Sequence, residues 1–222
     1  MSSTNPVSLA LVLALLALVP LAVVMTTSFL KIAVVLTLVR NALGIQQVPP
    51  NMALYGLALI LSAYVMGPVA MQIGEELRAR PAAPAPDVQA PDQINDIIDA
   101  VMRGAEPIRG FMMKNSRPEQ RDFFLRTART MWGDIAARNV KEDDILVLVP
   151  AFLVSELTAA FQVGFLLYLP FVIIDLIVSN ILLAMGMMMV SPVTISMPLK
   201  LFLFVMVDGW TRLIQGLVLS YA

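Results

Sequence analysis

Apolar residues dominate both ends of the chain, and polar residues dominate its middle. The stretch from Val7 to Met25 is apolar and long enough for one helix across a bilayer, with a kink expected at Pro20. The segment "NALGIQQVPPN" predicts a loop, because its two adjacent prolines cannot continue a helix. A second apolar helix is expected at about residues 52–73, so the N-terminal arm reads as a helical hairpin.

The middle of the chain carries the signals of shorter, amphipathic helices. "RARPAAPAPDVQAP" reads as a linker, since proline and alanine dominate it. "PDQINDIIDAVMRG" predicts a helix that Gly104 ends, and "RPEQRDFFLRTARTMWGD" predicts another that begins at Pro118. "KEDDILVLVPAF" starts a third, with acidic residues placed well for the helix dipole. These helices are expected to form a small soluble insertion.

The C-terminal arm is apolar and rich in helix-breaking residues. Its helices are expected to be interrupted at four prolines: Pro150, Pro170, Pro192 and Pro198. The fold class is therefore predicted to be all-α. Two apolar, kinked helical hairpins, residues 1–74 and 145–222, flank a polar helical segment, residues 75–144, which is expected to be periplasmic.

The distribution of charge supports this three-part division and limits the function. Residues 75–144 carry 24 charged side chains, and the other 152 residues carry only seven. Hydrophobic residues make up 59% of the chain, which is typical of a membrane protein or of the buried part of an assembly. The net charge of -1 argues against a nucleic-acid partner. The absence of His and Cys excludes imidazole and thiolate chemistry, so no metal, cofactor or catalytic site is expected.

The seven charges in the apolar arms need partners, because a charge in hydrocarbon costs at least about 2.5 kcal/mol. Asp208 and Arg212 are four residues apart, so they are expected to pair on one helix. The others are Lys31, Arg40, Glu156, Asp175 and Lys200.

These other charges either line a wet pathway or pair between helices or subunits. Pairing between subunits is the preferred interpretation for Lys31, Glu156 and Lys200. Alternatively, Lys31 and Arg40 reach a membrane interface with their long side chains.

Three long segments carry a resemblance to a known family. They are "MTTSFLKIAVVLTLVRNALGIQQVPPN" (residues 25–51), "PAFLVSELTAAFQVGFLLYLPFVIIDLIVSNILLAMGMMMVSP" (residues 150–192) and "PLKLFLFVMVDGW" (residues 198–210). They resemble the FliP/SctR family, core export apparatus proteins of type III secretion systems. The short middle segment and the lack of a cleavable signal before the first helix favour the injectisome branch.

The resemblance implies an assembled state and a set of partners. Five copies are expected to join an S-type and a T-type subunit in a helical ring, the entrance pore for unfolded protein substrates. Further export gate components and the energy source are separate proteins in such systems. The complex is expected in the bacterial inner membrane, at or above its periplasmic face.

The segment "AMGMMMV" is the expected functional element. Gly186 and Pro192 predict a loop or kink between two helices. Methionine is unbranched and soft, so it can adapt its shape around a neighbour. The resemblance implies that this loop is a gasket at the pore constriction, formed by Met185, Met187, Met188 and Met189 around Gly186.

Other functions remain open at this point. A small-solute or ion transporter would account for broken helices and intramembrane charges, although the two arms show no internal repeat. An intramembrane protease would need two aspartates, formally Asp175 and Asp208, but no protease motif surrounds them. A structural scaffold without a conduit is the third alternative.

Overall fold

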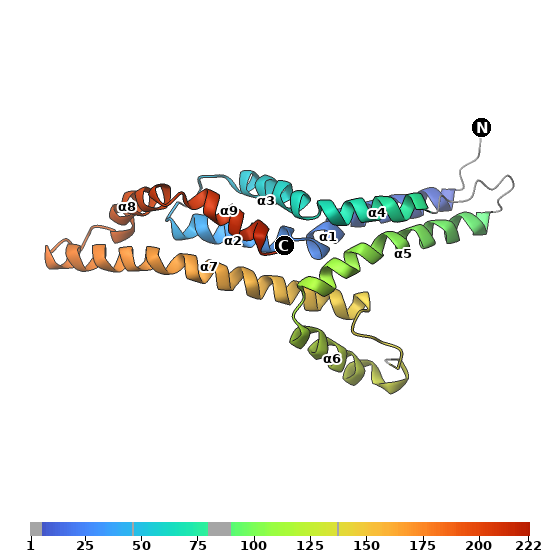
Figure 1. Ribbon diagram of the computed structural model, residues 1–222. Coiled ribbons are helices and arrows are strands. Elements are labelled where there is room, and N and C mark those ends of the chain that lie inside the picture. The colour runs from blue at the N-terminus through green and yellow to red at the C-terminus, as the bar shows by residue number, and fades with distance from the viewer. Residues whose placement is uncertain (1–5, 46, 80–89, 137) are drawn as a thin grey trace. The chain divides into compact units, whose positions relative to one another are not determined.

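The computed structural model describes residues 6–45, 47–79, 90–136 and 138–222. Within these ranges the chain is helical and contains no strand, which confirms the all-α prediction (Figure 1). The expected linker lies largely at residues 80–89, outside the described residues. The helices are α1 (Pro6–Thr26), α2 (Phe29–Ala42), α3 (Asn51–Val65), α4 (Gly67–Ala79), α5 (Ala90–Asn115), α6 (Pro118–Ala136), α7 (Ile145–Ala184), α8 (Pro192–Met206) and α9 (Gly209–Leu219).

The chain divides into two compact units that cut across the three segments expected from the charge pattern. Unit 1 contains residues 1–28 and 66–155, and unit 2 contains residues 29–65 and 156–222. Each apolar arm contributes to both units. Hydropathy along the chain finds apolar stretches, but it does not reveal which stretches pack together.

Unit 1 contains the whole of the polar segment, residues 75–144. Helix α4 packs along α5, and Met112, Leu148 and Phe152 form a small buried core. The backbone N–H of Arg117, just before α6, donates to the Ser155 hydroxyl of α7 at 2.9 Å. Because a helix start has free N–H groups, this bond helps to fix where α6 begins.

Unit 2 contains the main hydrophobic core. Helix α2 lies at its centre, where Ile32, Val35 and Leu36 are completely buried. Helices α3, α8 and α9 and the second part of α7 supply the remaining core residues. A Cβ atom at Gly164 of α7 would lie 2.3 Å from Cδ1 of Leu38 in α2, so the glycine allows this close approach of the two helices.

Four predicted helix boundaries are wrong. Helix α7 continues through Pro150 and Pro170 for 40 residues, α8 continues through Pro198, and α5 continues past Gly104. An interior glycine costs only about 1 kcal/mol relative to alanine, and apolar helices tolerate proline where their surroundings satisfy the freed carbonyl. The second apolar stretch, in contrast, forms two helices, α3 and α4, that break at Met66.

Among the described helices, α7 alone is long and apolar enough to cross a membrane without a break. Three further pairs reach the required length together, namely the end of α1 with α2, α3 with α4, and α8 with α9. The axes of α8 and α9 differ by 61°. If each pair forms one span, the number of spans rises to four.

Candidate functional site

The turn between α7 and α8 carries the methionine-rich segment, and we call residues 185–190 the methionine turn. Helix α7 ends in a Schellman motif, in which the N–H of Met187 donates to the carbonyl of Leu182 at 2.9 Å. The N–H of Gly186 donates to the carbonyl of Leu183 at 3.0 Å. Gly186 has φ 72°, the left-handed conformation that this motif requires and that other residues adopt only with strain. The expected break between two helices is therefore confirmed, and Gly186 is its structural cause.

The side chains of the methionine turn are exposed in the single chain. Met188 has 82% of its surface exposed and Met189 is fully exposed, while Met185 and Met187 are exposed to a smaller degree. Exposed apolar patches of this kind mark contacts with other molecules in many proteins. The turn therefore has the composition and exposure of a contact site.

Polar side chains connect α7 and α8, the helices on either side of the methionine turn. Lys200 of α8 donates to Oδ2 of Asp175 in α7 at 2.6 Å, and the Ser196 hydroxyl donates to the other carboxylate oxygen. Lys200 also donates to the carbonyl of Ala42, the last residue of α2, at 3.3 Å. Ser196 and Lys200 are buried, whereas Asp175 keeps 29% of its side chain exposed. We call these groups the Asp175 cluster.

A second buried group of polar side chains involves Glu156 of α7. Nζ of Lys31 lies 4.0 Å from Oε1 of Glu156 and donates to the Ser220 hydroxyl at 2.8 Å. The Tyr221 hydroxyl donates to Glu156, and the ammonium of Lys31 lies 4.2 Å from the centre of the Tyr221 ring. We call these four residues the Glu156 cluster. Tyr221 lies beyond the end of α9, and burial together with the Glu156 carboxylate raises its pKa above the ordinary value, so the phenol remains protonated.

The structure therefore gives the buried charges partners within one chain. Lys31 pairs with Glu156 and Lys200 pairs with Asp175, in each case between two helices. Pairing of these groups between subunits, which the sequence favoured, stays a prediction. Buried Arg40 donates to Asn51 Oδ1 and to the carbonyl of Pro49, and these bonds hold the loop between α2 and α3.

The expected ion pair of Asp208 with Arg212 is absent from the ion pairs of the described residues. Asp208 has φ 54° and lies between α8 and α9, so the spacing that brings charges together on one helix does not apply. Its carboxylate accepts a hydrogen bond from the Thr211 hydroxyl at 3.0 Å instead.

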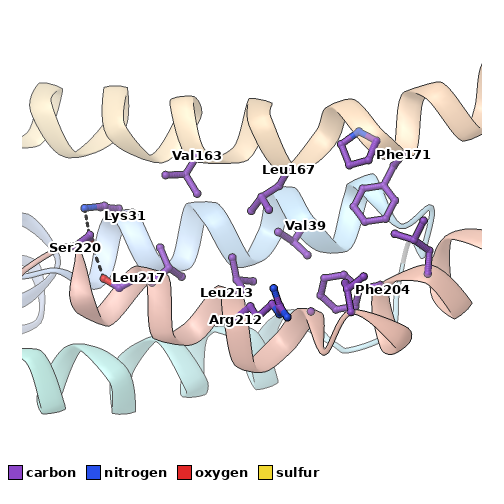
Figure 2. A pocket seen from close by; sticks show the side chains of 15 residues that line it. Lys31, Val39, Val163, Leu167, Phe171, Phe204, Arg212, Leu213, Leu217 and Ser220 are labelled. Carbon is purple, nitrogen blue, oxygen red and sulfur yellow. Dashed lines mark hydrogen bonds between the residues drawn. The ribbon is translucent and has the colours of Figure 1, made fainter.

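Arg212 lines a pocket of about 380 Å³ in unit 2. Figure 2 shows Lys31 and Ser220 at one end of this pocket and Phe171 and Phe204 at the other. Apart from the side chains of Lys31, Arg212 and Ser220 its lining is apolar. None of the described residues forms a group of three or more carboxylates that could bind a metal ion.

Sequence reasoning missed three polar partners of the buried charges. Ser196 is four residues before Lys200 on the same face of α8, a recognisable pattern in an otherwise apolar helix. Ser220 and Tyr221 follow the last helix, and no spacing rule connects them with Lys31 or Glu156.

The helices and the methionine turn define an all-α protein with long apolar segments and an exposed, methionine-rich turn. The model of the FliP family matches residues 12–217. The chain belongs to the FliP family, in the SctR branch of injectisome type III secretion systems. Its apolar helices and its family together indicate a protein of the inner membrane.

Similar proteins from three bacteria cover almost the whole chain. "Yop proteins translocation protein R" of Yersinia pestis is 51% identical over 217 residues, with 98% of this chain and 97% of the relative covered. "Virulence protein YscR" of Salmonella typhimurium is 47% identical over 218 residues, 98% of each chain. "Harpin secretion protein HrcR" of Erwinia amylovora is 45% identical over 217 residues, 98% of this chain and 97% of the relative. By name, the first of these relatives is a translocation protein, the second a virulence protein and the third a secretion protein.

Proposed function

We propose that this protein is a pore-forming subunit of the type III export gate. Five copies join an S-type and a T-type subunit in a ring at or above the periplasmic face of the inner membrane. Unfolded polypeptides enter the secretion pathway through this ring. Other components of the gate supply energy and substrates, and the chain itself contributes no catalytic step.

The observation that carries this proposal is the exposure of four methionines on one short turn. In a ring, each copy places its methionine turn at the same distance from the axis. Side chains that are exposed in one chain then meet their equivalents from the neighbouring copies. An apolar closure of this kind excludes water and ions, because ions lose their hydration in it.

Methionine suits such a closure better than other apolar residues. Its three rotatable bonds allow it to take many shapes, whereas valine and isoleucine are stiff at χ1. A ring of methionines can therefore fit around polypeptides of different sequence and close again behind them. The backbone of the turn stays defined by the Schellman motif of Gly186 during this change.

Replacement of Met187, Met188 and Met189 by alanine tests the seal. The chain is produced with its partner subunits, purified in mild detergent and reconstituted into dye-loaded vesicles. We expect complexes of normal mass and a several-fold faster loss of a small dye, because alanine leaves the constriction unfilled. A matched control replaces three exposed methionines outside the turn, Met52, Met71 and Met131, and should leave the vesicles tight.

Other outcomes favour other functions. Normal assembly with unchanged dye loss would favour a scaffold without a conduit. Flux of one small solute through the isolated chain would favour a transporter. A chain that stays a monomer in mild detergent would contradict the proposed ring.

A further inference from the structure

We propose that the Asp175 cluster is a positioning site that holds the methionine turn in place while its side chains move. The inference rests on the proposed function and adds how the gate opens. The backbone of α7 and α8 remains joined, and passage of a polypeptide displaces methionine side chains only. Asp175, Ser196 and Lys200 are therefore positioning residues of the gate.

The place of the cluster along the two helices supports this role. Asp175 precedes Met185 by ten residues, which corresponds to about 15 Å along α7 at 1.5 Å per residue. Ser196 follows Pro192, the first residue of α8, by one helical turn. The cluster thus connects the two helices within about three helical turns of the methionine turn, so it limits how far they can separate there.

The contacts of Lys200 join a third helix to the pair. Its ammonium bonds to Asp175 in α7 and to the carbonyl of Ala42 at the end of α2. The last carbonyls of a helix lack partners within the helix and carry partial negative charge, so they favour a cation. Helix α2 forms the centre of the unit 2 core, so Lys200 ties the turn to the most buried helix of that unit.

The surroundings of the cluster make its bonds costly to break. Lys200 keeps 2% of its surface exposed and Ser196 none. A buried ammonium that loses its carboxylate stays without compensation, and such a loss is strongly destabilising. The methionine turn, in contrast, makes few contacts within the chain, so the flexible part and the fixed part of the hairpin are separate.

A spin label in the turn tests the proposal. Because the chain has no cysteine, Met188→Cys gives one label in each copy of the chain and none elsewhere when the partner subunits are also free of cysteine. In assembled complexes, we expect Asp175→Asn and Lys200→Met to shorten the rotational correlation time of the label about twofold, since a released turn moves faster.

The matched control breaks the other buried ion pair of unit 2. Lys31→Met removes the partner of Glu156, lowers the stability and should leave the label unchanged. If Lys200→Met does not assemble, the correlation time of the label in Asp175→Asn decides the test. This variant should still assemble, because the amide preserves the side-chain volume and the acceptor for Ser196. An unchanged label in assembled Asp175→Asn complexes, or an equal change in Lys31→Met, would overturn the proposal.

Failure of the seal and failure of the positioning site are distinguishable. Dye loss from the methionine variants reports the seal, and label mobility reports the backbone of the turn. Normal dye loss from vesicles that carry the alanine variant would contradict the gasket. The mobility of the spin label would still show whether the Asp175 cluster fixes the turn.

Discussion

An ion pair of unit 1 and an ion pair of unit 2 lie in opposite surroundings. In unit 1, Arg126 pairs with Asp122 at 2.7 Å, and the two side chains are 77% and 52% exposed. In unit 2, Lys31 and Glu156 are only 7% and 4% exposed. Exposed pairs contribute at most about 1 kcal/mol, since water solvates both charges in either state.

The difference shows that burial, and not distance, decides what an ion pair does. The exposed pair is close and bidentate, yet its loss returns both groups to water. The Glu156 pair has a longer separation, 4.0 Å, but the carboxylate also accepts from Tyr221, and Lys31 also donates to Ser220. Removal of one member leaves the other charged and buried, which costs about 3–5 kcal/mol.

Charge reversal at Glu156 should have the largest effect. Glu156→Lys places two ammonium groups together in the core of unit 2, and we expect a destabilisation of at least about 3–5 kcal/mol. The assembled complex should disappear from native gels. The control Asp143→Lys reverses a charge that is 42% exposed and should assemble normally. Full-size complexes with Glu156→Lys would show that the buried pair is dispensable.

Removal of one hydroxyl should have an intermediate effect. Tyr221→Phe preserves the ring beside Lys31 and removes a donor to Glu156, which should cost about 1–3 kcal/mol. The thermal midpoint of the purified complex measures the loss. Tyr64→Phe, at a tyrosine that is 74% exposed, is the matched control. Equal midpoints for both variants would contradict the importance of the hydroxyl.

Loss of the exposed pair should have the smallest effect. Asp122→Asn removes the charge that faces Arg126 and should change the stability by less than about 0.5 kcal/mol. The same thermal measurement should give the midpoint of the unaltered complex within its error. A decrease as large as that of Tyr221→Phe would remove the contrast between the two units.

Much of the methionine turn could be predicted from the sequence, because its signals are local. Gly186 lies near the start of the segment and Pro192 lies just after its end, and together they predict the break between α7 and α8. The Schellman motif also depends on residues within one turn of Gly186, so sequence spacing suffices to place it. The role of the methionines as a seal remains a prediction that the dye experiment tests.

The prolines of α7 show where local signals fail. Pro150 and Pro170 predict interruptions, but α7 continues through both. The cost of an interior proline depends on whether neighbouring groups satisfy the freed carbonyl, and those groups are distant in sequence. The broken second helix, in contrast, has a local signal, because Gly67 and Pro68 begin α4 directly after the break at Met66.

By itself, the sequence determined the helical class, the apolar character of both arms, the family resemblance and the turn at Gly186. These properties follow from composition and short-range spacing, which act within a few residues. Only the tertiary structure decided which charges meet: Lys31 with Glu156, and Lys200 with Asp175 and the end of α2. These partners are separated by 25 to 158 residues, and the packing of helices, which no local rule encodes, brings them within reach.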